Sequence, residues 1–212
     1  MIYVFGNSHS HTFTNSDVGL ANSWGNNKNE NFTSFSLGPV IAYNFIEHHY
    51  NRLIDIISNL NIKSDDYILL AIGEVDCRWH IPYQADIQKR NIDEVVKECV
   101  DRFFRAHLKL KSIGYNVIGW GGHPSTVDGH SDDSQRPIFG DCLRRNEISK
   151  LWVKYLSENC INHTIPFVSI IDDIISEDGM TKMEYFSDYC HLNYDKVSDI
   201  INIKFKEKKI IL

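Results

Sequence analysis

The sequence has few of the features that mark cross-linked, zinc-binding or membrane-spanning proteins. Its five cysteines are widely spaced and form no Cys-x-x-Cys pair: Cys77, Cys99, Cys142, Cys160 and Cys190. A disulfide framework or zinc knuckle is therefore not expected, and reduced thiols in a cytoplasm fit this pattern better. No uninterrupted apolar run approaches the ~18 residues that are needed to span a bilayer. The chain is not predicted to cross a membrane.

An excess of positive charge is also missing. The chain has 22 Lys and Arg against 28 Asp and Glu, which gives a formal net charge of −6. This balance argues against broad, charge-driven binding to nucleic acid or to anionic membranes. The lysine-rich tail at 204–209 is interpreted as a solvated helix end. No charged segment followed by an apolar one opens the sequence, so we expect no signal peptide and a cytoplasmic location.

What the sequence does contain is enough apolar material for a substantial core. The 212 residues are 42% hydrophobic and 12% aromatic, and 24% are charged. These values are typical of a globular protein. No internal repeat, low-complexity tract or linker divides the chain, so residues 1–212 are predicted to form a single domain.

Strand patterns alternate with helix patterns along the whole chain. Apolar runs predict strands at 1–5, 32–37, 66–72, 115–120 and 167–170. Helical spacing predicts helices from Gly38-Pro39 to about residue 60, from Asn91 to Gly114, from Asp141 onward and from about residue 193. Such alternation favours a parallel sheet covered on both faces. The predicted fold is a three-layer α/β/α sandwich with about five parallel strands in flavodoxin-like order.

Polar residues follow the predicted strands at the edge where ligands bind in open α/β sheets. The candidates are Ser8 and His9 after the first strand, Gly38 after the second, Glu74, Asp76, Arg78 and His80 after the third, and His123 after the fourth. Residues 11–31, 121–140 and 171–192 are predicted to be long irregular segments. Loops of this length inside a compact domain are often functional.

Asp188 and His191 form the pair that points to a particular chemistry. A serine hydroxyl is a poor nucleophile near neutral pH, and it needs a base within hydrogen-bond reach that is itself oriented by an acceptor. An Asp-x-x-His turn can hold one imidazole nitrogen with the aspartate while the other nitrogen faces the serine. Ser8 after the first strand and His191 before the last helix therefore predict a nucleophile and its base.

The sequence resembles the SGNH/GDSL hydrolase superfamily in four blocks. Gly6-Asn-Ser-His-Ser10 lies where that family has its first block, and Gly38 matches the glycine of block two. Gly73-Glu-Val-Asp76 matches block three, and Asp188-Tyr-Cys-His191 matches block five. The resemblance extends from residue 2 to about residue 205. It implies an esterase or a related acyl-group enzyme.

Carried over to this sequence, the resemblance implies that Ser8 is the nucleophile, His191 the general base and Asp188 its orienting partner. The backbone N–H groups of Ser8 and Gly38 would contribute to an oxyanion hole. No cofactor and no metal are implied.

Two positions depart from the family pattern. Asn7 replaces the usual Asp of block one, and Val75 stands where block three has an oxyanion-hole Asn. Valine cannot donate a hydrogen bond, and losing one such donor can lower the rate on the order of 100- to 1000-fold. Arg78 is the nearest replacement, with His80 behind it.

The run Gly-Glu-Val-Asp-Cys-Arg-x-His resembles a variant third block of SGNH-like proteins associated with polysaccharide biosynthesis. Asp76, Arg78, His80 and His123 are accordingly predicted to bind the substrate. A guanidinium near the site could also bind an acidic sugar.

Structural explanations compete with several of these roles. Asp76 and Arg78 could form an ion pair that only fixes the loop, and His123 could be an ordinary loop histidine. Asp188 and His191 could do no more than cap the last helix, and Cys190 is interpreted as a packed turn residue. His9 and His11 alternate, which could suggest a metal site, but no full ligand set accompanies them.

The leading hypothesis is a serine esterase that hydrolyses an acyl ester, most simply an acetyl ester, on a small molecule or carbohydrate. Acyl transfer to a glycan is the first alternative, because the same three residues serve both reactions. A glycan-binding module with weak catalysis is the second, and Val75 is the reason to consider it.

Overall fold

A central sheet organises the protein. The computed structural model describes residues 1–14, 27, 28, 30–129 and 138–211. The strands are β1 (Ile2–Gly6), β2 (Asn27–Lys28), β3 (Phe32–Ser36), β4 (Tyr67–Ala71), β5 (Asn116–Trp120) and β6 (Phe167–Val168). Their order is β2-β3-β1-β4-β5-β6. The five strands from β3 to β6 are parallel, and β2 pairs antiparallel with β3 at the edge.

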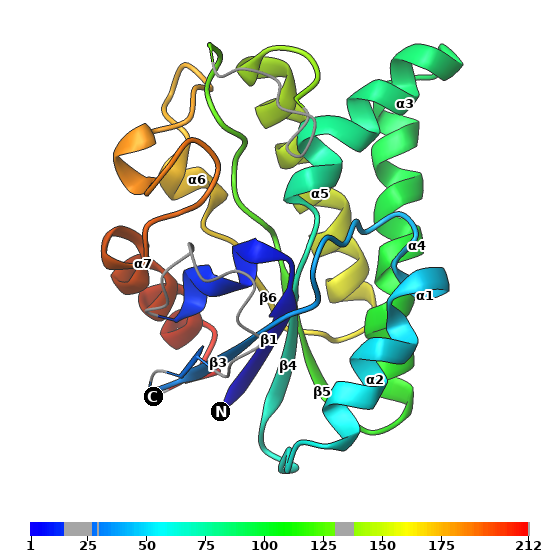
Figure 1. Ribbon diagram of the computed structural model, residues 1–212, viewed down its shortest axis with the longest axis vertical. Coiled ribbons are helices and arrows are strands. Elements are labelled where there is room, and N and C mark those ends of the chain that lie inside the picture. Colours follow the sequence, from blue (N-terminus) through cyan, green and yellow to red (C-terminus); the bar gives the residue numbers. More distant parts are fainter. Residues whose placement is uncertain (15–26, 29, 130–137, 212) are drawn as a thin grey trace.

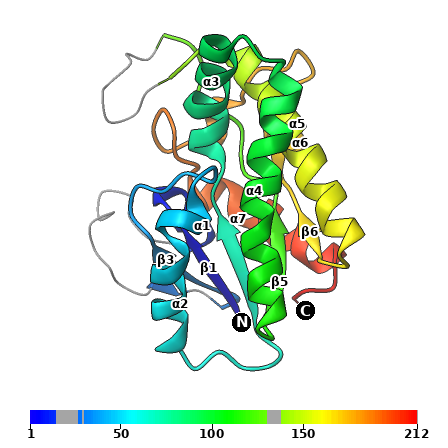
Figure 2. The same cartoon turned by 90° about the vertical axis from the view of Figure 1, so that its right-hand side faces the viewer.

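Helices cover both faces of this sheet, as the two views in Figures 1 and 2 show. The α-helices are α1 (Phe45–His48), α2 (Tyr50–Ser58), α3 (Ile81–Gln88), α4 (Ile92–Ser112), α5 (Cys142–Asn162), α6 (Ile171–Ile174) and α7 (Tyr194–Glu207). Three further helical segments are not α-helical. The 3₁₀-helices η1 (Ser8–Phe13) and η4 (Met183–Tyr185) have tighter turns than an α-helix, and the π-helix η3 (Asp76–His80) has wider turns.

Each face of the sheet has its own apolar core. Phe5, Ile68 and Leu70 point to one side, where they belong to a cluster with residues of α1, α2, α4 and α5. Val4 and Leu69 point to the other side and join a cluster with residues of η1, α6 and α7. This opposition follows from the two-residue period of a strand, which sends neighbouring side chains to opposite faces. The result is the predicted three-layer α/β/α arrangement.

The parallel strands follow the predicted flavodoxin-like order. β1 is the first of these strands in the chain, but in the sheet it lies between β3 and β4. The chain passes from β1 to β3 on one side and then crosses to β4, β5 and β6 on the other side, so the direction of winding reverses next to β1. Ligands of open α/β sheets bind outside the carboxyl ends of the strands at such a switch point. Ser8 follows β1 by two residues and is therefore carried to this place.

Gly6 is required where β1 meets β4. A Cβ atom at this position would lie 2.3 Å from the carbonyl oxygen of Ala71. Only glycine allows the two strands to approach this closely just before the Ser8 turn.

Most predicted elements are confirmed within a few residues. All five predicted strands form, and α4 and α5 begin directly after Asn91 and Asp141. Both cap residues accept a backbone N–H with their side chains. Gly114 follows α4 with φ +99°, as expected for a glycine that ends a helix.

The helix predicted between Gly38-Pro39 and about residue 60 is confirmed only in its later part, as α1 and α2, and its predicted start is wrong. Gly38 has φ +77°, outside the helical region, and the first helix begins only at Phe45. The backbone between Gly38 and Phe45 forms hydrogen bonds with a distant residue instead. The amides of Ala42 and Tyr43 donate to the carboxylate of Asp76 at 2.7 and 3.2 Å. This long-range contact is invisible to local spacing and replaces the first turn of the expected helix.

Short helical segments also occupy regions predicted to be irregular. The polar segment after β4 forms η3 and continues into α3, and α6 and η4 lie within 171–192. Most of the loop predicted at 11–31 lies outside the described residues, but its start belongs to η1. Among the described helices, none has both the length and the apolar character that crossing a bilayer requires. All five cysteines are buried free thiols.

Candidate active site

The structure brings Ser8, His191 and Asp188 into one hydrogen-bonded chain. The Nε2 atom of His191 lies 2.8 Å from the Oγ of Ser8. On the other side of the ring, Nδ1 lies 2.8 Å from Oδ2 of Asp188. A serine, an imidazole and a carboxylate in this order have the geometry needed to activate a hydroxyl.

The Ser8 turn is shaped by its neighbours in sequence. Asn7 caps η1, because its Oδ1 accepts the backbone N–H of His9 at 3.0 Å. The Oγ of Ser10 donates to the carbonyl of Asn7 at 2.9 Å. Asn7 thus supplies the capping carboxamide where a carboxylate was expected, and the turn is kept. Ser8 stays partly exposed at its start.

The Asp188 turn fixes the imidazole of His191. Oδ1 of Asp188 accepts the backbone N–H groups of Cys190 and His191, both at 2.7 Å. Its second oxygen is left for the ring Nδ1. One carboxylate therefore holds both the backbone and the ring of His191, which sets Nε2 toward Ser8.

Burial and nearby charge shift the titration of both groups. Burial lowers the pKa of His191, the neighbouring His9 adds to this, and Asp188 partly opposes it. Burial would raise the pKa of Asp188, but hydrogen bonds from His191 and the turn amides outweigh burial and lower that pKa below its ordinary value. At neutral pH the imidazole is therefore a free base beside an ionised carboxylate.

A second buried group of polar side chains lies beside these three residues. Nε2 of His9 contacts Oε2 of Glu74 at 2.8 Å, and Nδ1 of His9 contacts Nε2 of His123 at 2.6 Å. The Nε of Arg78 donates to Oε1 of Glu74 at 2.8 Å. The ring of His9 lies 5.0 Å from that of His191, centroid to centroid.

Asp76 does not have the position predicted for a substrate-binding residue. Its carboxylate is fully buried and accepts the amides of Ala42 and Tyr43. The predicted alternative of an Asp76–Arg78 ion pair is also wrong, because the Nε of Arg78 donates to Glu74 instead. Asp76 has a structural role: it fastens the segment after β3 to the start of η3.

The other predicted residues lie at the same edge, with different surroundings. His123 is buried against His9, and a direct contact between His123 and substrate stays a prediction. His80 is partly exposed and packs on the ring of Tyr43 with centroids 4.9 Å apart. The N–H of Gly38 donates to Oγ of Ser36 at 3.2 Å. Oxyanion contacts from Gly38 and Arg78 stay predictions.

Glu74 and His9 are among the candidates predicted at this edge of the sheet, but the sequence did not reveal their contact with each other. Both follow strands of the predicted site edge, but no motif gave them a role. The available signal was their position: Glu74 directly follows Gly73 of block three, and His9 directly follows Ser8. Polar side chains that are buried need hydrogen-bond partners. Because His9 and Glu74 lie at adjacent strand ends of a parallel sheet, they can be partners of each other.

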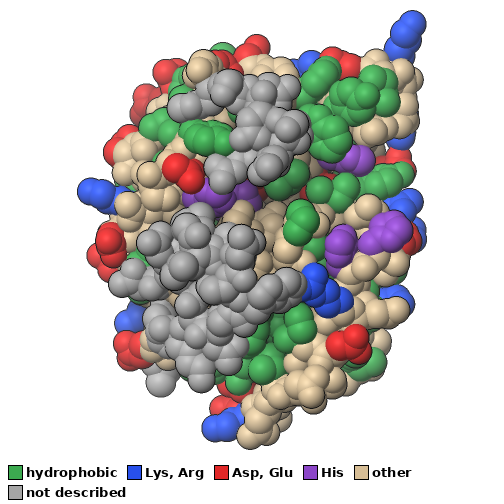
Figure 3. All heavy atoms as spheres, viewed as in Figure 1, with side chains coloured by type: hydrophobic (Ala, Val, Ile, Leu, Met, Phe, Trp, Pro, Cys, Tyr) green, Lys and Arg blue, Asp and Glu red, His purple; other side chains and the backbone are tan. Residues whose placement is uncertain are grey.

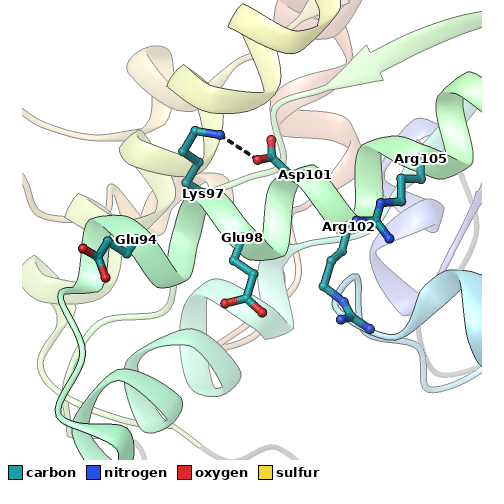
Figure 4. A pocket seen from close by; sticks show the side chains of 6 residues that line it. All are labelled: Glu94, Lys97, Glu98, Asp101, Arg102 and Arg105. Atoms are coloured by element: carbon teal, nitrogen blue, oxygen red, sulfur yellow. Dashed lines mark hydrogen bonds and ion pairs between the residues drawn. The ribbon is translucent and has the colours of Figure 1, made fainter.

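A shallow pocket elsewhere has a different character. It encloses about 360 Å³ on the outer side of α4 (Figure 4) and is lined by Glu94, Lys97, Glu98, Asp101, Arg102 and Arg105. Lys97 and Asp101 pair across one helical turn at 2.6 Å. Mixed charges of this kind are typical of a solvated helix face, and no nucleophile lies among them.

Comparison with known proteins supports the fold through structure alone. No family model matches the chain, and no curated protein matches it. A GDSL-like lipase from Bacteroides thetaiotaomicron VPI-5482 matches with a TM-score of 0.63 and 13% identity, covering 99% of this chain and 86% of that one. A member of the lipolytic protein G-D-S-L family from Veillonella parvula DSM 2008 matches with a TM-score of 0.56 and 16% identity, covering 97% and 96%. The acetyl xylan esterase AlAXEase matches with a TM-score of 0.53 and 13% identity, covering 98% and 99%.

The chain has the SGNH hydrolase fold. This agrees with the resemblance drawn from the four sequence blocks and with the strand order. Within the SGNH fold, Ser8 follows the first strand and the Asp188–His191 turn precedes the last helix, as the blocks predict. Val75, which lies between Glu74 and Asp76 at the start of η3, is the position where this chain departs from the usual block three.

Proposed function

We propose that this protein is a serine hydrolase that cleaves an acyl ester by way of an acyl-enzyme. The observation that carries the proposal is the hydrogen-bonded chain from Ser8 Oγ through the His191 ring to Asp188. A hydroxyl, an imidazole and a carboxylate in this order support the roles of nucleophile, base and orienting group. Solved structures of similar fold that are called lipases and esterases support the same reaction class.

The reaction follows from the geometry. Oγ of Ser8 attacks the ester carbonyl carbon while Nε2 of His191 takes the hydroxyl proton, and Asp188 stabilises the imidazolium that forms. The tetrahedral intermediate collapses, the ester C–O bond breaks, and the departing alcohol receives the proton from Nε2. Water then repeats the sequence on the Ser8 ester and releases the acid. The lowered pKa of His191 keeps it able to accept a proton at neutral pH.

The oxyanion of the intermediate needs donors where the usual asparagine is replaced by Val75. The backbone N–H groups of Ser8 and Gly38 are the proposed donors, and Arg78 is the proposed third. In the free protein the N–H of Gly38 bonds the hydroxyl of Ser36, so substrate has to displace this contact. Fewer strong donors imply slower turnover.

A carbohydrate ester is the proposed substrate class. Aromatic side chains lie just beyond Arg78: the ring of Trp79 stacks on Tyr83 at 5.6 Å, and Phe139 meets Tyr83 edge-on at the same distance. All three rings are partly exposed. Half-buried aromatic faces next to polar groups suit ligands that present both C–H and O–H surfaces, as sugars do. Figure 3 shows histidine and hydrophobic side chains close together on the face of the molecule that Figure 1 also presents.

The acyl group proposed is acetyl, and similarity to an acetyl xylan esterase supports this choice. Acyl transfer to a glycan hydroxyl is the alternative within the same chemistry, since the acyl-enzyme can be opened by a sugar instead of water. A glycan-binding module with little catalysis is the alternative that Val75 favours, because this side chain removes one expected oxyanion donor.

Turnover of p-nitrophenyl acetate and of an acetylated oligosaccharide by wild type and Ser8→Ala tests the proposal. Hydrolysis by wild type that is lost in Ser8→Ala supports it. Equal rates in the two proteins would contradict the mechanism. Acetylated glycan formed from an acyl donor would identify transfer, and glycan binding without any turnover would identify the binding module.

A further inference from the structure

Four buried ionisable side chains lie next to Ser8 and His191, and of these four only Arg78, as a proposed oxyanion donor, has a part in the proposed reaction. They are His9, Glu74, Arg78 and His123, and none is more than 4% exposed. They come from three separate strand ends, after β1, β4 and β5. Burying charged groups is costly unless each is paired, so their contacts show what the cluster is built to hold.

Glu74 is the centre of this cluster. One carboxylate oxygen accepts from Nε of Arg78, and the other contacts Nε2 of His9, both at 2.8 Å. Burial by itself would raise the pKa of Glu74, but the charges of Arg78 and His9 outweigh burial and hold that pKa well below its usual range. An ionised carboxylate only accepts hydrogen bonds, so Nε2 of His9 must carry a hydrogen.

This assignment leaves Nδ1 of His9 to meet Nε2 of His123, 2.6 Å away. Burial lowers the pKa of His123 well below its ordinary value, so this ring is neutral. When His9 carries hydrogen on Nε2 alone, His123 donates to His9 and His9 donates to Glu74, while the charges of Arg78 and Glu74 offset each other. The cluster then carries no net charge inside the protein.

The cluster reaches Ser8 and His191 through His9. This residue directly follows Ser8, and its ring joins the Ser8 turn to the end of β4 through Glu74. Its centroid is also 5.0 Å from that of His191. The negative charge of Glu74 raises the pKa of His191 and so favours the imidazolium, in opposition to burial.

We propose that His9 and Glu74 form a second carboxylate–imidazole pair that positions the Ser8 turn and, through the charge of Glu74, stabilises protonated His191 during the reaction. This inference rests on the proposed roles of Ser8 and His191. His9 and Glu74 are positioning residues, since neither contacts Oγ of Ser8 or the Nε2 of His191. Their chemistry is separate from the oxyanion hole and from Asp188.

Two nuclear magnetic resonance measurements on protein with ¹⁵N-labelled histidine test the proposal without relying on turnover. The first reads the tautomer of His9 in the wild type, where the proposal expects hydrogen on Nε2. The second follows the titration midpoint of His191 in wild type and in Glu74→Gln. The substitution keeps the side-chain shape and removes the negative charge that favours protonated His191, so the His191 midpoint should fall by about one pH unit.

Removing both charges separates electrostatics from packing. Glu74→Gln combined with Arg78→Gln removes the positive charge of Arg78 together with the negative charge of Glu74, so the His191 midpoint should lie between those of Glu74→Gln and the wild type. Glu98→Gln is the matched control, because Glu98 also pairs with an arginine, at 2.7 Å, but on the outer face of α4. It should leave the midpoint unchanged. The acid limb of the kcat/KM profile should follow the same pattern, with kcat affected more than KM.

A His9 ring without hydrogen on Nε2 in the wild type would overturn the proposal, and this reading does not depend on whether Glu74→Gln folds. An unchanged His191 midpoint in folded Glu74→Gln would overturn it as well. Failure of the hydrolase proposal gives a different signature: turnover independent of Ser8, with the two magnetic resonance results as expected here.

Discussion

The Nε2 atom of His191 lies 2.8 Å from the Oγ of Ser8, although 183 positions separate these residues in the chain. The contact joins the turn after the first strand to the loop before the last helix. Replacing His191 with Asn removes the base and keeps a polar side chain of similar reach. The rate of ester hydrolysis should fall at least roughly 1000-fold, with protein stability changed little. Steady-state kinetics and thermal unfolding of the variant check both parts.

Asp188→Asn should also lower kcat, by roughly 10,000-fold, because the carboxamide no longer holds the imidazole in the tautomer that faces Ser8. The turn should survive, since the asparagine oxygen can still accept the amides of Cys190 and His191. Cys190→Ala is the matched control in the same turn, since the Cys190 side chain has no role in the proposed mechanism. A Cys190→Ala loss as large as that of Asp188→Asn would contradict the role given to Asp188.

The pH dependence of kcat/KM should show a catalytic base whose pKa lies below the ordinary pKa of histidine. Burial and His9 lower the pKa of His191 from 6.5, and His191 acts only when neutral. Activity should therefore rise with pH through a midpoint below 6.5 and be level at neutral pH. A midpoint above 6.5 would show that the environment of His191 favours its charged form, contrary to this account.

Asp76 should make stability depend on pH. Burial raises the pKa of Asp76 to about 6 from 3.8, so the folded state binds its proton more tightly than the unfolded chain does. The resulting stabilisation is fully present below pH ~4 and is lost as pH rises through 6. Relative to Asp76→Asn, the free energy of unfolding of the wild type should fall by about 2 kcal/mol between pH 4 and pH 7. Urea unfolding of both proteins at the two pH values measures this difference, and a constant difference would contradict it.

Arg145 should be important for stability, although it lies outside the proposed mechanism. The side chain is fully buried and donates to Oγ of Ser125 at 3.0 Å, to the carbonyl of Thr126 at 2.8 Å and to the carbonyl of Gly140. Arg145→Met leaves these acceptors buried without a donor, so unfolding should become easier by about 3 kcal/mol.

Arg105→Met is the control for this prediction, because Arg105 is exposed on α4 and its substitution should change stability by less than about 0.5 kcal/mol. Equal effects of the two substitutions would show that the buried contacts of Arg145 contribute nothing specific.

The fold was predictable because its strands and long helices carry strong local signals. The apolar run from Tyr67 to Ala71 can only be a buried strand, and Asn91 and Asp141 mark helix starts through their caps. The helix expected at Gly38 failed because a distant group, Asp76, binds the backbone amides that local spacing assigned to a helical turn.

The candidate site was predictable only in part. Ser8, Asp188 and His191 were found because their chemistry needs a fixed order of residue types, which leaves a pattern in sequence. The partners of Glu74 could not be found, since His9 and Arg78 are common polar residues and only the packed strand ends bring them together. The same cause made Asp76 and Arg78 look like a pair, although the fold joins each of them to a different group.

Covalent labelling by a fluorophosphonate tests the central claim most directly, because such a probe reacts with an activated serine and needs no knowledge of the substrate. A single adduct per chain is expected, located on Ser8 by peptide mass spectrometry. The adduct should be absent in Ser8→Ala and strongly slowed in His191→Asn. Folded wild-type protein that remains unlabelled, or is labelled equally in Ser8→Ala, would contradict the account.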